Sequence, residues 1–552
     1  MALSNALSEG TPQIDKWHWE THDVAYTDGH FYSVKPPGLS LMTLPLYEGL
    51  RQAGGEGVAR DARIRGEAGG QYPWAARKLP AASYGFSRTR ATAARTAIIN
   101  DAPMTWALGL FGVLVPALIL LVVVARMVER VAPGTGTAAA LALGAGTMIL
   151  PFSTLYFSHV ISALLAFGAF ALLWREREGE GPARMRQLAL AGLIAGLAIV
   201  FEYPLLIATA IVGIYALTLR GGSLISRGAA YGAGVLAGIA PLLAYNTWAF
   251  GSPLHNSYAN AVSKTGFTGH HEVGLNADGF FGITLPRIGD GLMLLFSGRG
   301  MVTLTPVLVL ALAGVIVMYR DRRHRAEARV ILAVALAFLF YNAGYWLPMG
   351  GGSPGPRFLI PILPFLAIGL GLAWRRWPAM TLAFTAISAT SMALATISYP
   401  MIGVNDPGEW VRRLFEFGTF QHSVLDLTGI AHGLPAILPF LLIVAIAIGL
   451  GVRTLGSAQL ALGARRVPLA VGGWALCAVA LPQPGELPSG GALALVAASM
   501  AIALLAVGAA VLVGSRSRSA SRSAGRGVSG QAEEHHAGAQ LALEVQTAQR
   551  SG

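Results

Sequence analysis

Thirteen apolar segments follow one another between Trp106 and Gly514, most of them separated by short polar connections. A helix needs about 20 apolar residues to cross the hydrocarbon core of a bilayer. The whole chain is 54% hydrophobic and only 12% charged, with a mean hydropathy of +0.56. A soluble domain carries roughly twice that charged fraction. The pattern therefore predicts an all-α polytopic membrane protein with about 13 transmembrane helices.

The segments predict the following helices: Trp106–Ala125, Thr135–Leu155, His159–Trp174, Leu188–Glu202, Pro204–Leu219, Ala229–Phe250, Met301–Tyr319, Val330–Leu347, Phe358–Trp374, Met380–Tyr399, Leu434–Val452, Val467–Leu481 and Leu493–Gly514. The division at Pro204 has an alternative, because a proline can also break a single long tilted helix. Two helices at this point keep every later basic connection on one side.

Basic residues occupy alternate connections. Such an alternation marks the cytoplasmic side of a membrane protein. The net charge of +12 is therefore explained by cytoplasmic loops and does not indicate binding of nucleic acid. The basic set begins at Arg126 and continues through the clusters near Arg175, Arg220, Arg320, Arg375 and Arg465. Between the helices, the other side carries only Lys264, Arg287, Arg299, Arg357, Arg412 and Arg413. This orientation predicts a multi-pass membrane protein with a cytoplasmic C-terminus. The many Ala, Gly and Arg residues with few Lys indicate a GC-rich bacterial genome, so we expect the membrane to be a bacterial inner membrane.

Three parts of the chain follow from this orientation. Residues 1–105 form a first non-cytoplasmic loop with interfacial helices, residues 106–514 the transmembrane domain, and residues 515–552 a disordered tail poor in apolar residues. A loop of that length on the far side needs a helix to translocate it, so we expect a helix to precede residue 1. In the alternative, the first helix of the chain carries the N-terminus across.

Side chains that could act in catalysis or binding are concentrated between Asp15 and Tyr47. This stretch contains carboxylates, histidines, aromatic residues and one lysine. Lys35 precedes Pro36 and Pro37, which hold the chain extended, and Gly38 then allows a turn into an interfacial helix. A cation fixed at the membrane surface suits a lipid-phosphate headgroup. The alternative is an ordinary lysine in a solvated loop.

Two further charged residues adjoin apolar segments. Glu202 is the only carboxylate within an apolar stretch, where an ionisable group is costly and often functional. Arg357 follows a Gly/Pro-rich loop, and its guanidinium can hold a phosphate by two hydrogen bonds. The alternatives are solvation at a helix end for Glu202 and contact with lipid headgroups for Arg357.

Several short motifs occur in order along residues 5–370. They are Asp28–Gly29–His30, Tyr32–Ser33–Val34–Lys35–Pro36–Pro37–Gly38, Phe157–Ser158–His159, Glu202–Tyr203–Pro204, Tyr245–Asn246 with Phe250–Leu254, Phe296–Gly300, and Trp346 followed by Gly350–Gly352 and Gly355–Phe358. The ordered set resembles bacterial membrane glycosyltransferases of the GT-C type. This superfamily includes protein O-mannosyltransferases, aminoarabinose transferases and rhizobial lipopolysaccharide sugar transferases.

The resemblance implies a GT-C-like bundle with large non-cytoplasmic loops and a polyprenyl-phosphate-linked sugar as donor. It also implies a glycan, lipid or protein acceptor, and a carboxylate of the first external loop as base. Family members commonly place that acid just after a first helix, where this chain has Asn5, so Asp15 and Asp28 become the catalytic candidates. The candidates for substrate binding are Lys35, His30, Tyr32, Arg357, Glu202 and His159.

Other functions stay open at this point. A flippase for lipid-linked sugars would need no chemistry, although such transporters tend to show repeated halves, which this sequence does not display. A catalytically inactive protein of envelope assembly is a further alternative. We predict no dedicated metal site, because the adjacent His270 and His271 lack the i, i+4 spacing of helical zinc ligands. A divalent ion held by loop acids remains an alternative.

Overall fold

The computed structural model describes residues 1–513 except 19–20, 22, 69–103, 263–278, 417, 419, 422, 428, 456–462 and 483–487. In this part of the chain, eight helices are long and apolar enough to cross a membrane. They span Met104–Val131, His159–Glu178 (α9), Leu224–Phe250 (α12), Arg325–Gly344 (α16), Arg357–Arg376 (η5 and α17), Pro378–Ile397 (α18), Leu434–Gly451 (in α21, Leu434–Leu455) and Gly490–Val513. The molecule is therefore the predicted helical multi-pass membrane protein.

The remaining apolar segments form shorter or bent helices. These are Gly136–Gly146 (α7), Ile149–Ser153 (α8), Met185–Phe201 (α10), Leu205–Leu217 (α11), Val467–Ala480 (α23), and Ile288–Phe296 (α13) with Met301–Leu304 (α14) and Val307–Arg320 (α15). The pair formed by Ile288–Leu304 and Val307–Arg320 bends by 92° and gives a ninth span if it counts as one. The predicted number of 13 spans stays a prediction.

Glycines allow two of these helices to pack with their backbones in contact. A Cβ atom on Gly192 or Gly234 would lie 2.0 Å from a carbonyl oxygen of the facing helix, and one on Gly238 would lie 2.3 Å from the Leu193 oxygen. Helices α10 and α12 therefore meet along a face of small residues.

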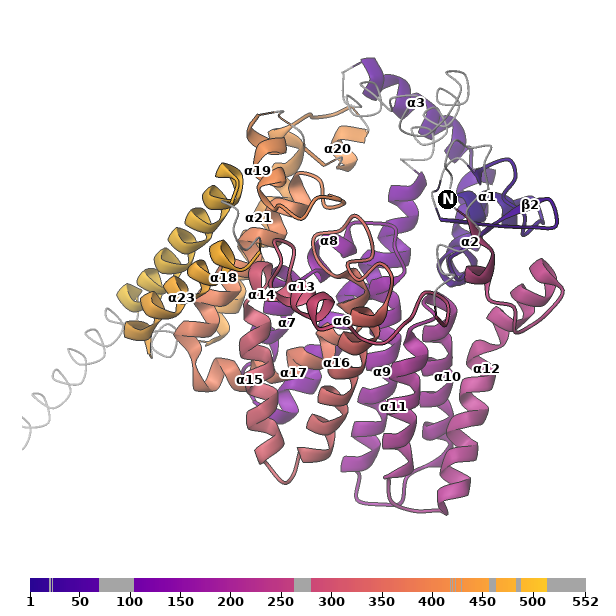
Figure 1. The fold of residues 1–552 in the computed structure, drawn as a ribbon, viewed down its shortest axis with the longest axis horizontal. Helices are drawn as coiled ribbons and strands as arrows, with labels where there is room; N and C mark the ends of the chain where they lie inside the picture. Colours follow the sequence, from indigo (N-terminus) through magenta and orange to yellow (C-terminus); the bar gives the residue numbers. More distant parts are fainter. Residues whose placement is uncertain are drawn as a thin grey trace, which may run out of the picture.

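One end of the bundle gathers the arginine-rich connections (Figure 1). The Ala183 amide donates to the Arg220 oxygen at 2.7 Å, and Arg375 donates to the Pro133 oxygen at 2.8 Å. An ion pair of 3.2 Å joins Arg177 on α9 to Glu327 on α16. The structure thus brings these basic connections to the same end, in agreement with their alternation along the sequence. Which membrane face this end occupies stays a prediction.

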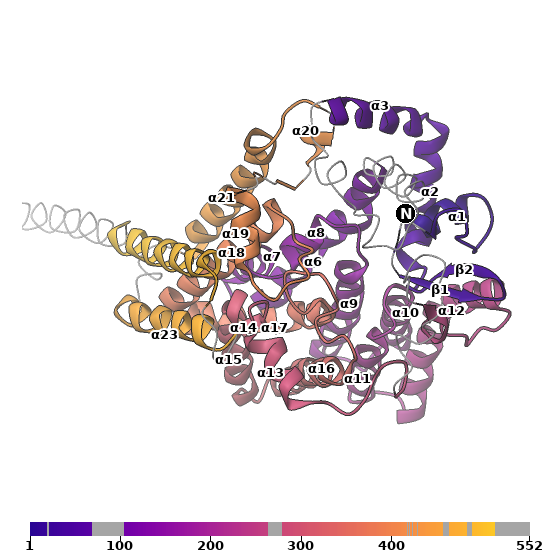
Figure 2. The ribbon, with the colours of Figure 1, turned by 45° about the horizontal axis from the view of Figure 1, so that its top comes forward.

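The opposite end carries the N-terminal part of the chain (Figure 2). Here lie the short helix Ala2–Ser8 (α1), the helices Gly38–Gln52 (α2) and Gly55–Ala68 (α3), and a small sheet with the order β2-β1-β3. The sheet pairs Val24–Thr27 (β1) with His30–Ser33 (β2) on one side and with Ala261–Val262 (β3) on the other. The 3-10 helix Ser257–Asn260 (η4) precedes β3. The remaining elements are Gly408–Phe415 (α19), Val424–Leu427 (α20), the π-helix Leu110–Leu114 (η3) and Val115–Val131 (α6) within the first span, and the 3-10 helix Ala464–Arg466 (η6).

Candidate functional site

A cleft of about 270 Å³ opens at this N-terminal end of the bundle. Five segments that lie far apart in the sequence line it: the first residues of the chain, the stretch from Thr21 to Ser40, the start of α9, the break between α10 and α11, and the start of η5. Its ionisable lining side chains are Asp23, Lys35, His159, Glu202 and Arg357. Four of these five residues were candidates for substrate binding from the sequence. The fifth, Asp23, belongs to the stretch from Asp15 to Tyr47 but was not a candidate.

Tight local geometry places Lys35 in the cleft. The β1–β2 hairpin turns at Asp28 and Gly29, both with positive φ, and β2 then leads to Lys35. Gly38 begins α2, and a Cβ atom on it would lie 2.5 Å from the Val200 oxygen of α10. The glycine is therefore required by close packing of α2 on α10, and not by a turn as the sequence suggested.

The Lys35 ammonium has one neutral and one charged partner. Its Nζ donates to the Tyr258 hydroxyl at 2.9 Å and lies 3.8 Å from the Asp23 carboxylate. Burial raises the pKa of Tyr258 well above its usual value, so this hydroxyl stays neutral and does not cancel the lysine charge. One third of the Lys35 side chain remains exposed, at 34%. The ammonium is thus held in position and still open to a ligand.

Arg357 is buried, and no described residue supplies a counter-ion for its charge. The residue is only 9% exposed, and its Nε has no hydrogen-bond partner in the part of the chain that the structure describes. Among the described residues its guanidinium makes no ion pair, and its neighbours are the rings of Phe157 and Phe358, each 5.5 Å away. A buried charge without a partner is costly, and this one lines an open cleft. Such an arrangement could bind an anion.

His159 and Glu202 form a buried pair on the cleft wall. Their side chains are 5% and 9% exposed, and His159 Nδ1 lies 3.1 Å from Glu202 Oε1. The Ser158 hydroxyl donates to the same carboxylate oxygen. Pro204 explains the position of Glu202, because α10 ends at Phe201 and α11 begins at Leu205, which leaves Glu202 at the interruption.

Four sequence candidates lie outside the cleft lining. Asp15 accepts hydrogen bonds from the Phe31 amide and the His30 ring, both at 2.7 Å, and thereby ties the N-terminal segment to β2. Asp28 is exposed at the hairpin turn. Tyr32 is buried against the ring of Phe250. Asp15, Asp28, His30 and Tyr32 therefore support the sheet, whereas Asp23, which the sequence did not single out, reaches the cleft.

Arg299 is a second buried arginine at this end, and the sequence gave it no role. It is 5% exposed, and it donates to the carbonyl oxygens of Gly351, Ser353 and Ile402 at 2.9 to 3.0 Å and of Gly403 at 3.3 Å. The residue thus joins two connections near the cleft. Carbonyl oxygens accept from its two terminal nitrogens, whereas its Nε, like that of Arg357, has no hydrogen-bond partner among the described residues.

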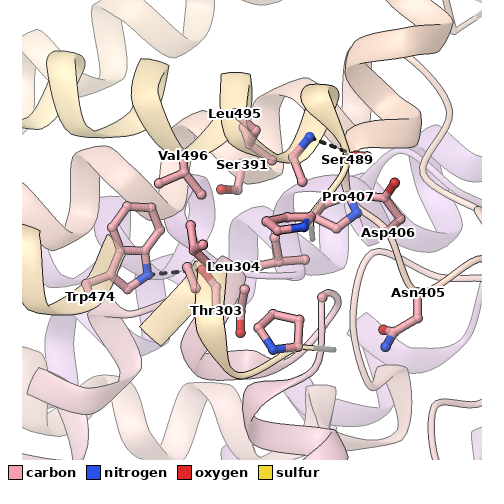
Figure 3. A pocket seen from close by; sticks show the side chains of 16 residues that line it. Thr303, Leu304, Ser391, Asn405, Asp406, Pro407, Trp474, Ser489, Leu495 and Val496 are labelled. Carbon is pink, nitrogen blue, oxygen red and sulfur yellow. Dashed lines mark hydrogen bonds between the residues drawn. The ribbon is translucent and has the colours of Figure 1, made fainter. Parts of the chain in front are cut away.

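A smaller cavity of about 40 Å³ lies among α14, α18, α23 and the helix Gly490–Val513 (Figure 3). Trp474 forms one wall and donates from Nε1 to the Thr303 oxygen at 3.1 Å. Among the described residues, its polar lining consists of neutral groups and one carboxylate, Asp406, with no basic side chain. This cavity can hold a few water molecules, but it lacks the cations that distinguish the cleft.

No family model, no curated protein and no solved structure matches this chain. Four of the motifs that carry the resemblance contribute residues to the cleft: Tyr32–Gly38, Phe157–His159, Glu202–Pro204 and Gly355–Phe358. The described residues contain no group of three or more His, Cys, Asp or Glu side chains that could hold a metal ion. His270 and His271 and the tail 515–552 lie outside the described residues.

Proposed function

We propose that this chain is a membrane glycosyltransferase that moves a sugar from a polyprenyl-phosphate carrier to an acceptor on the non-cytoplasmic face. The observation that carries the proposal is the cleft with two cations, one of them the buried Arg357 without a counter-ion. The cleft lies at the end of the bundle away from the arginine-rich connections, which is the non-cytoplasmic end by the positive-inside rule.

Lys35 and Arg357 would hold the phosphate of the donor. The sugar leaves its carrier when the bond between the anomeric carbon and the phosphate oxygen breaks, and negative charge then develops on the phosphate. Cations already fixed in place stabilise this charge without reorganising during the reaction. A guanidinium adds two parallel hydrogen bonds to phosphate oxygens.

Asp23 would take the proton of the acceptor hydroxyl. A base must come within hydrogen-bond reach of that proton, and among the described residues Asp23 and Glu202 are the only carboxylates that line the cleft. Glu202 is engaged by His159 and Ser158, whereas the Asp23 side chain is half exposed, at 49%. We therefore propose Asp23 as the base in place of the sequence candidates Asp15 and Asp28.

The walls of the cleft suit a carrier with an apolar chain. Leu39, Phe157 and Phe358 line the cleft together with the charged groups, so a phosphate and an isoprenoid could be bound together. Membrane lipids surround the bundle, since long apolar side chains of α12 and α16 are exposed, Leu236 by 67% and Phe340 by 56%. A donor can therefore reach the protein from the bilayer.

The test uses membranes that contain the chain and radiolabelled polyprenyl-phosphate mannose, glucose or arabinose. We expect label to leave one of these lipids, and Asp23→Asn to reduce the transfer rate at least about 100-fold, the scale of a general base. Asp28→Asn is the matched control, because this aspartate lies at the exposed turn of the same hairpin, and it should keep the wild-type rate.

Three outcomes would count against the proposal. Equal rates for Asp23→Asn and wild type would remove Asp23 from the reaction. Movement of labelled lipid across the membrane with no release of sugar would favour a flippase. Correct insertion with neither movement nor release for any carrier-linked sugar would favour an inactive envelope protein.

A further inference from the structure

We propose that His159, held by Glu202, is a third cationic group for the donor phosphate, beside Lys35 and Arg357. This inference rests on the proposed function and adds a residue to its phosphate site. It also predicts that the affinity for phosphate depends on pH, because an imidazole gains and loses its proton near neutrality whereas an ammonium and a guanidinium do not.

A carboxylate faces one nitrogen of the imidazole. His159 Nδ1 lies 3.1 Å from the Glu202 carboxylate, and both side chains are almost fully buried. A carboxylate this close stabilises an imidazolium. Because Nδ1 faces Glu202, Nε2 is the nitrogen that remains for a ligand, and His159 lines the cleft. The carboxylate thus orients the ring as well as stabilising its charge.

The imidazole and the Arg357 guanidinium share two aromatic neighbours. The ring of His159 lies 5.9 Å from that of Phe157, stacked on it, and 5.9 Å from that of Phe358. Arg357 lies 5.5 Å from each of the same two rings. Both groups are therefore in one small part of the cleft wall, where a single phosphate can be close to both.

A positive charge on His159 would stabilise the phosphate as its negative charge increases during the reaction. The donor is a phosphate diester with one negative charge. When the anomeric carbon–oxygen bond breaks, the electron pair leaves with the phosphate, which becomes a monoester with up to two. The acceptor oxygen forms the new bond to the anomeric carbon, and its proton goes to Asp23. An imidazolium beside Arg357 offsets the second charge on the departing phosphate.

Binding of a short-chain isoprenyl phosphate to the purified full-length chain, measured by calorimetry between about pH 5.5 and about pH 8.5, tests this assignment. The charged groups that face His159 from neighbouring elements are Asp23, Lys35, Glu202 and Arg357, and groups of these types ordinarily titrate outside this range. The ligand itself gains negative charge here, since the second pKa of a phosphate monoester is about 6. Any loss of affinity at high pH therefore comes from the imidazole.

We expect the wild-type affinity to fall by about tenfold or more from the low to the high end of the range, which corresponds to one charge-assisted hydrogen bond. His159→Gln should bind about tenfold more weakly at low pH and lose the fall. His255→Gln is the control, because this histidine stacks on Phe250 outside the cleft lining, and it should behave as wild type.

Each result separates the two proposals. Binding and sugar transfer that do not change between wild type and His159→Gln would overturn the role of His159 and leave the glycosyltransferase standing. No binding of isoprenyl phosphate by wild type at any pH would overturn both. Inorganic phosphate that binds as tightly as the isoprenyl phosphate would show a general anion site and overturn the assignment to a lipid carrier.

Discussion

Replacement of Arg357 by methionine should remove function without loss of stability. The guanidinium is buried, its Nε is without a partner, and its described neighbours are the rings of Phe157 and Phe358. A methionine is apolar, has a similar length and packs well against aromatic rings. The substitution therefore removes a charge that the folded protein alone does not neutralise.

The change in the free energy of unfolding combines two opposing effects. Two cation–π contacts are lost, each about 0.5 to 2 kcal/mol. The cost of burying an unsatisfied polar nitrogen disappears, about 1 to 3 kcal/mol. The two nearly cancel, so Arg357→Met should unfold within about 1 kcal/mol of wild type. Transfer from the lipid donor should fall about 100- to 1000-fold, as for other groups that stabilise a developing anion.

Arg299→Met is the matched comparison, because Arg299 is equally buried at the same end of the bundle. Its guanidinium donates to four backbone carbonyl oxygens, which methionine would leave without their donor. Each buried orphan costs about 1 to 3 kcal/mol, and partial relaxation brings the expected total to about 3 to 5 kcal/mol. Thermal unfolding in detergent, followed by the size-exclusion profile, measures both variants. Equal destabilisation by the two substitutions would show that Arg357 is a structural residue and refute the reasoning.

Two further predictions concern the helices that support the cleft. Gly238→Leu should separate α12 from α10 and lower the thermal stability strongly, since a Cβ atom alone would lie 2.3 Å from a carbonyl oxygen; Gly232→Leu, in open space on the same helix, should unfold as wild type does. Glu327→Gln should cost about 1 to 3 kcal/mol, because Glu327 is 2% exposed and pairs with Arg177. The exposed Glu180→Gln serves as its control, and a smaller effect for Glu327→Gln than for Glu180→Gln would contradict the prediction.

The class of fold followed directly from the sequence, because the length and polarity of helices in a membrane are tightly constrained. Helix lengths were less predictable. The apolar stretch Thr135–Leu155 has enough residues for a span, yet α7 ends at Gly146 and α8 begins only at Ile149. Thr147 between them has an extended backbone. Mean hydropathy does not register such an interruption, since the residues on both sides of it are equally apolar.

Part of the set of candidate residues lies together in the structure, while the roles of these residues stay predictions. Lys35, Arg357, Glu202 and His159 line one cleft as a set, although up to 322 residues of chain separate them. The carboxylates were harder to rank, because Asp15, Asp23 and Asp28 occur within one short acidic stretch. Their roles depend on the register of the β1–β2 hairpin, which places Asp28 at the turn and Asp23 just before the first strand. A signal for this register did exist in the sequence, since Asp28–Gly29 is a typical hairpin turn.

The two buried arginines show why the surroundings of a charged side chain could not be predicted from the sequence. Arg299 and Arg357 both lie near a membrane end, both have glycine nearby, and both lie within motifs of the same resemblance. They differ only in what surrounds the guanidinium, which is a ring of carbonyl oxygens for Arg299 and two aromatic faces for Arg357. Backbone carbonyls belong to every residue, so no sequence pattern records which of them converge on a side chain. A charge left unsatisfied by the fold becomes visible only in three dimensions, and there it indicates the position where a substrate would supply the missing anion.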